Sequence, residues 1–111
     1  LKGHARDMKY FGRLASIQRK LEGSLTQLAQ AFQANDEPLA KQILADYTSV
    51  KEECSTVLQD VFQDTLETRE AVATALLSRF LKRINSHISN IASGLVYPID
   101  QIDFVRGQQF Q

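Results

Sequence analysis

The chain has 111 residues, of which 43% are hydrophobic and 23% are charged, and its 13 basic and 13 acidic residues leave no net charge. This length suits one domain with a single core, and the balanced charge lacks the basic surplus expected of a nucleic-acid-binding protein. No apolar run is long enough to cross a bilayer, and no secretory signal is recognisable. We therefore expect a soluble single domain with no nucleic-acid partner and no membrane-spanning segment in this chain.

Cysteine usage favours a reducing compartment. Cys54 is the only cysteine, so it has no partner for an internal disulfide or for a zinc site. It also falls on an apolar helical stripe, where a free cysteine behaves as a small hydrophobic residue. We expect Cys54 to be structural and the chain to be cytoplasmic, at the inner face of the cell membrane if it serves a membrane protein.

The first predicted element is a long amphipathic helix at about residues 7–34, after a frayed segment at residues 1–6. Its apolar residues recur at steps of three and four, which is the spacing of a buried helical stripe. The stripe consists of Tyr10, Leu14, Ile17, Leu21, Leu25, Leu28 and Phe32.

The second predicted helix spans about residues 37–64 and follows the sequence Asn35-Asp36-Glu37-Pro38, which is typical of a helix stop and a new start. Its apolar stripe consists of Leu39, Ile43, Tyr47, Val50, Cys54, Val57 and Val61. Its other side is acidic, with Asp46, Glu52, Glu53 and Asp60. Because the first helix is mostly basic, we expect attraction between these two neighbours.

The third predicted helix spans about residues 69–96 and ends before Pro98, which disfavours a helical residue at position 97. The break before it contains neither Gly nor Pro, so we expect a turn near residues 64–69 with Asp64 or Thr65 as the cap, and a single bent helix is the alternative. The apolar stripe predicted to be buried consists of Leu77, Leu81, Ile84, Ile88, Ile91 and Leu95.

Together these elements predict an all-α fold, an antiparallel up-down-up three-helix bundle over residues 7–98. The C-terminal tail at residues 99–111 mixes apolar and polar residues, and part of it is expected to dock on the bundle.

A polar row lies beside the apolar stripe of the third helix. Arg83, His87 and Asn90 occupy positions i, i+4 and i+7, so they share one face. Residues 81–92 read Leu-Lys-Arg-Ile-Asn-Ser-His-Ile-Ser-Asn-Ile-Ala. This segment resembles the last helix of a PhoU repeat, the three-helix domain of bacterial phosphate-uptake regulators, whose pattern reads Leu-Glu-Arg-Ile-x-Asp-His-x-x-Asn-Ile-Ala. Two positions differ: Lys82 stands in place of Glu, and Ser86 in place of Asp.

The resemblance implies a cytoplasmic regulatory module that acts on phosphate uptake. Such modules occur in two-repeat regulators that contact a phosphate transporter and its sensor kinase, or as C-terminal domains of sodium/phosphate cotransporter-like membrane proteins. A single repeat, a first residue other than Met and the loss of the acidic motif favour the second setting. The expected partner is a phosphate transporter or the protein's own membrane domain, and two copies could pair as a homodimer.

The resemblance also implies metal-binding carboxylates, and these are the residues that the chain has lost. A cation at Lys82 repels a metal ion, and Ser86 is a poor ligand. Asp46, Glu52, Glu53 and His87 remain as weak candidates for a composite site. We expect no metal and no cofactor.

The remaining polar residues have structural and functional interpretations. For His87 and Asn90 we favour half-buried side chains that hydrogen-bond a neighbouring helix and fix its register. Arg79, Lys82 and Arg83 could bind phosphate, an anionic membrane surface or a partner, but the favoured interpretation is a solvated face that pairs with the acidic second helix.

No catalytic constellation is recognisable. The sequence has no strand-to-helix elbow around a nucleophile and no phosphate-binding glycine loop. We therefore predict a non-enzymatic regulatory or interaction domain linked to phosphate transport. The alternatives are a helical adaptor without a phosphate role and a weak metal-binding bundle.

Overall fold

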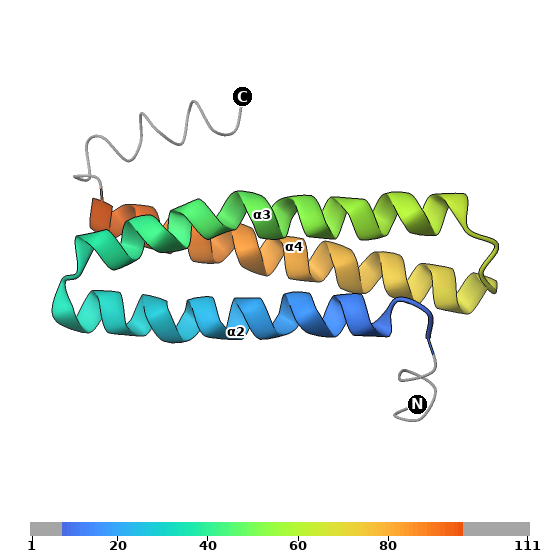
Figure 1. The fold of residues 1–111 in the computed structure, drawn as a ribbon, viewed down its shortest axis with the longest axis horizontal. Coiled ribbons are helices and arrows are strands. Elements are labelled where there is room, and N and C mark those ends of the chain that lie inside the picture. The colour runs from blue at the N-terminus through green and yellow to red at the C-terminus, as the bar shows by residue number, and fades with distance from the viewer. Residues whose placement is uncertain (1–7, 97–111) are drawn as a thin grey trace.

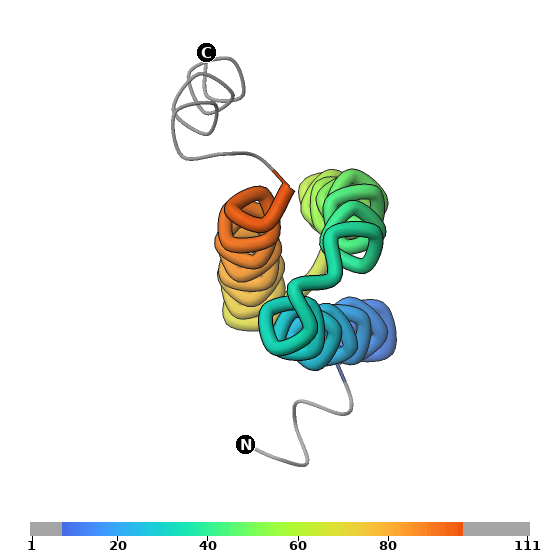
Figure 2. The backbone as a smooth tube through the Cα atoms, turned by 90° about the vertical axis from the view of Figure 1, so that its left-hand side faces the viewer, coloured from blue at the N-terminus to red at the C-terminus, as the bar shows by residue number. Residues whose placement is uncertain are grey.

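The computed structural model describes residues 8–96, which form three helices: α2 (Phe11–Ala34), α3 (Glu37–Gln63) and α4 (Thr68–Val96). The helices run up, down and up beside one another (Figure 1), and the end-on view shows them at the corners of a triangle (Figure 2). This is the predicted all-α bundle. None of the described helices combines the length and the apolar character needed to cross a membrane.

The bounds of two of the three helices lie close to the predicted ones. Helices α3 and α4 begin and end within one residue of the predicted limits, whereas α2 begins at Phe11 instead of residue 7. The expectations for a frayed segment at residues 1–6 and for a docked tail at residues 99–111 lie outside the described residues.

The turn between α2 and α3 is formed by the residues from which it was predicted. Asn35 adopts a left-handed conformation with φ of 49°, and its N–H donates to the Ala31 carbonyl, which closes α2. The Asp36 carboxylate then accepts a hydrogen bond from the Leu39 N–H at 3.1 Å, and Pro38 stands in the first turn of α3.

The second turn separates α3 from α4, so the alternative of one bent helix is wrong. Asp64 is extended and closes α3, and its carboxylate accepts from the Thr65 N–H at 2.7 Å. The predicted role of Asp64 or Thr65 as the cap of the third helix is also wrong, because α4 begins only at Thr68.

The core between α2 and α3 follows the predicted stripes closely. Most members of both stripes are buried, but Leu25 and Phe32 of α2 are about half exposed. The buried apolar residues of α2 and α3 with side chains larger than alanine are Leu14, Ile17, Leu21, Leu28, Ile43, Val50, Cys54, Val57 and Val61, with Tyr10 just before α2.

The predicted burial of α4 is wrong for half of its stripe. Ile88 is buried and Leu81 and Leu95 are half-buried, but Leu77, Ile84 and Ile91 are 41–49% exposed. The residues of α4 that are buried are mostly small or polar: Thr74, Ser78, Asn85, Ile88, Ser89, Ala92 and Ser93. Apolar residues cover most of the circumference of this helix, so their spacing alone could not show which side faces its two neighbours.

Candidate functional site

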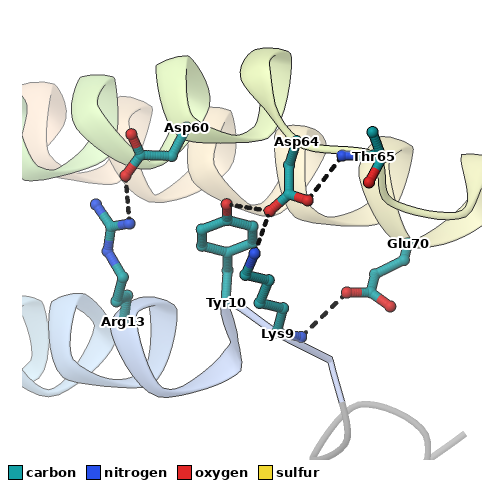
Figure 3. A network of polar contacts seen from close by, with 7 residues as sticks. All are labelled: Lys9, Tyr10, Arg13, Asp60, Asp64, Thr65 and Glu70. Carbon is teal, nitrogen blue, oxygen red and sulfur yellow. Dashed lines mark hydrogen bonds and ion pairs between the residues drawn. The ribbon is translucent and has the colours of Figure 1, made fainter.

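Opposite charges join α2 to α3, as the charge distribution predicted. Arg13 contacts Asp60 at 2.6 Å (Figure 3), and Lys20 contacts Glu53. These carboxylates therefore lie on the side of α3 that faces α2. Exposed pairs of this kind contribute little to stability, about 0 to 1 kcal/mol each. They show, however, that the acidic face of α3 is turned toward α2.

A tighter polar cluster closes the end of the bundle where α3 stops (Figure 3). The Asp64 carboxylate accepts hydrogen bonds from Lys9 Nζ at 2.6 Å and from the Tyr10 hydroxyl at 2.7 Å. The hydrogen bond from Lys9, followed by that from Tyr10, lowers the pKa of Asp64 to about 2. The backbone N–H of Lys9 also donates to the Glu70 carboxylate, so this corner joins all three helices.

Two polar side chains of α4 make the hydrogen bonds that fix it against α3. Asn85 donates to the Tyr47 carbonyl at 2.9 Å, and Ser78 donates to the Cys54 carbonyl at 2.8 Å. Both side chains are buried. Sequence reasoning missed them because it treated the apolar residues of α4 as the core. A regular spacing of Thr74, Ser78, Asn85 and Ser89 was the available signal.

The row of Arg83, His87 and Asn90 does share one side of α4, but its predicted packing role is not what the structure shows for His87. Arg83 and His87 are exposed and Asn90 is half-buried. Within residues 8–96 none of these three side chains hydrogen-bonds another helix; Asn85 has that role instead. Arg83 instead lies at the groove between α3 and α4, and His87 is exposed to solvent.

A groove of about 670 Å³ lies between α3 and α4, and we call it the cationic groove. One side carries Arg79, Lys82 and Arg83, at positions i, i+3 and i+4 of α4. Lys82 Nζ lies 3.5 Å from the Ser55 hydroxyl on the α3 side. No Asp or Glu is among the residues that line the groove. Its full lining is Cys54, Ser55, Leu58, Ala75, Leu76, Ser78, Arg79, Lys82, Arg83 and Ser86.

The predicted pairing of this cationic patch with the acidic face of α3 is wrong. Over residues 8–96 the structure has no ion pair to Arg79, Lys82 or Arg83. The acids of α3 are turned toward α2, where Glu53 and Asp60 already meet their cations. The groove consequently keeps three cations without a carboxylate beside them.

The four weak metal candidates are not brought together. Glu53 is held by Lys20, and Asp46 accepts a hydrogen bond from Gln42 within α3. Glu52 lines a separate groove next to α2, and His87 is exposed on α4. In the described part of the chain no group of three or more His, Cys, Asp or Glu side chains has the proximity that a metal ion needs.

A second surface feature is apolar, and we call it the α2/α4 face. Its members on α4 are between 41% and 53% exposed, and those on α2 are exposed to a similar degree. At about 100° per residue, they lie well over 100° around their helices from Lys20 and Lys82, which mark the sides that face α3. Both sets therefore lie on sides of their helices that are turned away from α3. The face consists of Leu25, Phe32, Leu77, Phe80, Ile84 and Ile91.

Comparison with known families supports the resemblance carried by residues 81–92. The family model described as the PhoU domain matches residues 14–95, which includes nearly all of the three helices described above. Comparison with the curated proteins and with the solved structures gives no match. The family match covers well over half of the chain, and the three-helix architecture agrees with it. The chain therefore belongs to the PhoU domain family.

Proposed function

We propose that this chain is a non-enzymatic docking domain that regulates phosphate transport, and that it works as a homodimer through the α2/α4 face. Membership of the PhoU family supports a regulatory role in phosphate homeostasis. The setting we propose is a cytoplasmic domain of a sodium/phosphate cotransporter-like protein or a single-repeat PhoU-type regulator. Its partner is then its own membrane domain or a phosphate transporter.

The observation that carries the docking proposal is the exposure of the α2/α4 face. Exposed apolar surface of unusual extent marks interaction sites, and the large apolar side chains of this face are 41–53% exposed. The exposed residues of α4 follow a heptad spacing, since Leu77, Ile84 and Ile91 are seven residues apart and Phe80 falls between the first two. This spacing suits packing against another long helix.

The same spacing favours a second copy as the occupant. If two α4 helices pair in antiparallel fashion with Ile84 at the twofold axis, Leu77 of one copy lies opposite Ile91 of the other. A twofold interface requires such self-complementarity, because the same patch is used on both subunits. The α2 members, Leu25 and Phe32, then extend the contact on both sides of the helix pair.

The test compares two phenylalanines that receive the same substitution. Phe80→Glu places a charge in the α2/α4 face, whereas Phe62→Glu changes a side chain that is 78% exposed on α3, outside the face. By light scattering we expect the unaltered chain and Phe62→Glu to be dimers and Phe80→Glu to be a monomer. Monomers for all three proteins at every concentration would exclude the homodimer.

The phosphate role is tested in cells that carry the full gene. We expect Phe80→Glu to remove the response of phosphate uptake to external phosphate, and Phe62→Glu to preserve it. If deletion of the whole domain leaves uptake and its response unchanged, the domain is an adaptor without a phosphate role.

A further inference from the structure

We propose that the cationic groove between α3 and α4 is a binding site for a phosphate group, carried by inorganic phosphate, a phosphomonoester or a lipid headgroup. Arg79, Lys82 and Arg83 supply the positive charge, and Ser55 supplies a hydroxyl from the opposite wall. The inference does not rest on the homodimer, because the groove and the α2/α4 face lie on different sides of α4.

The positive charge of the groove is not compensated by acids of the described residues. Arg79, Lys82 and Arg83 stand within one turn of each other, and like charges at such spacing destabilise a helix. Elsewhere in the described residues Lys9, Arg13, Lys20 and Lys41 each have a carboxylate beside them, whereas the cations without one, Arg19, Lys51 and Arg69, stand far apart in the sequence and do not line the groove. The three cations of the groove have none within residues 8–96, and no acid lines it. A bound dianion would offset this repulsion.

The groove also offers several hydrogen-bond donors. Lys82 Nζ approaches the Ser55 hydroxyl at 3.5 Å, so Ser55 accepts there and keeps its own proton to donate to a ligand. Two guanidinium groups and one ammonium group add several further donors at the same edge. Guanidinium groups match phosphate geometry with two parallel hydrogen bonds, whereas lysine acts as a compact point charge.

The floor of the groove is partly desolvated. Cys54 is 1% exposed at the base of the groove, and burial, as the largest effect, raises the pKa of its thiol. Leu58 and Ala75 also line this floor. Charge interactions strengthen where water is excluded, and Lys82 is the half-buried member of the three cations, so its charge attracts an anion more strongly than a cation on an open helix surface does. The volume of about 670 Å³ lies within the range of small-ligand sites.

The experiment compares two lysine substitutions in the full chain. Lys82→Gln removes the central cation of the groove, and Lys51→Gln removes an exposed lysine of α3 that stands over the Tyr47 ring, outside the groove. Binding of inorganic phosphate is measured by calorimetry and by the rise in melting temperature, against chloride at equal ionic strength. We expect tenfold or greater loss of phosphate affinity for Lys82→Gln and no change for Lys51→Gln.

Two readouts keep the result interpretable. In phosphate-free buffer we expect Lys82→Gln to melt no lower than the unaltered chain, because the substitution relieves repulsion. An Ile91→Glu protein, altered in the α2/α4 face two turns from Arg83, should bind phosphate as the unaltered chain does, even if the homodimer proposal fails. Equal affinity for phosphate and chloride in every arm, or equal loss in both lysine variants, would overturn the proposal.

A further arm identifies the source of the phosphate group. Vesicles of phosphatidic acid in phosphatidylcholine are compared with vesicles of phosphatidylcholine alone. If Lys82 is needed for binding to phosphatidic acid and free phosphate does not bind, the ligand is a lipid headgroup. If free phosphate binds and the vesicles do not, the ligand is a soluble phosphate. Binding to neither overturns the assignment.

Discussion

Between α2 and α3, aliphatic side chains fill the interior and opposite charges meet at the edge, whereas α4 buries serine, threonine and asparagine and exposes leucine, isoleucine and phenylalanine. The first interface has the pattern expected of two helices that need no further partner. Helix α4 does not have this pattern. One of its sides carries cations without an ion pair in the described residues, and another side exposes large apolar residues. We infer that α4 carries the contacts of the domain with other molecules.

The largest effect that sharpens this comparison concerns two isoleucines on α4, one turn apart. Ile88 is 3% exposed and Ile84 is 41% exposed. We expect Ile88→Ala to lower the free energy of unfolding by about 2 to 4 kcal/mol, because it removes buried methyl groups and leaves a cavity. Ile84→Ala should cost the monomer less than about 1 kcal/mol.

The measurement is urea unfolding of both variants in a Phe80→Glu background, which separates monomer stability from dimerisation. If Ile84→Ala is as destabilising as Ile88→Ala there, the exposed side of α4 is wrongly assigned.

The next effect concerns the buried amide of α4. Asn85→Ala removes the hydrogen bond to the Tyr47 carbonyl, and we expect a loss of about 1 to 3 kcal/mol in the free energy of unfolding. The control is Asn90→Ala, which removes a half-buried amide of the same helix and should cost less than about 0.5 kcal/mol. If urea unfolding gives the same loss of stability for both variants, Asn90 has the packing role that its position in the motif predicted.

A smaller effect, of opposite sign, is expected at Thr74. Its hydroxyl is buried and has no hydrogen-bond partner within the part of the chain that the structure describes. Thr74→Val keeps the branched shape and removes the unsatisfied oxygen, so we expect about 1 kcal/mol of stabilisation. The comparison is Ser78→Ala, which loses a hydrogen bond at 2.8 Å to the Cys54 carbonyl and should be destabilising. Thermal or urea unfolding distinguishes the two signs.

The smallest effect concerns pH and the corner at Asp64. The folded pKa of Asp64 is about 2, below its ordinary value of 3.8, because Lys9 and Tyr10 donate hydrogen bonds to the ionised form. The stabilisation is therefore fully present above pH 4 and is lost as the pH falls through about 2. Asp64→Asn should flatten this part of the stability profile. An unchanged slope between pH 4 and pH 2 would contradict the assignment.

The fold could be predicted from the sequence, and the side of α4 that faces the core could not. The turn at Asn35 and Asp36 and the buried stripes of α2 and α3 follow from local chemistry and spacing. In α4, Ile84 and Ile88 both fit the same three-and-four spacing, and their burial differs because the neighbouring helices cover only one of them. Which isoleucine is buried depends on how the three helices pack, and the spacing of apolar residues in one helix does not contain that information.

The candidate site was predicted by residue type and not by partner. Arg79, Lys82 and Arg83 were identified as a cationic patch, and their pairing with α3 was expected because α3 is acidic. The structure shows that Glu53 and Asp60 face α2 instead. Which base meets which acid depends on which side of α3 each neighbour occupies, and composition does not contain that information.

The most direct test of the proposed pairing is the rate of disulfide formation in Ile84→Cys, compared with Phe62→Cys. Cys54 should not interfere, since it is buried and the pKa of its thiol is raised. Antiparallel pairing about Ile84 brings the two introduced thiols together, so we expect a covalent dimer to form at least tenfold faster for Ile84→Cys at low protein concentration. Equal rates for the two variants would contradict the pairing of two copies through the α2/α4 face.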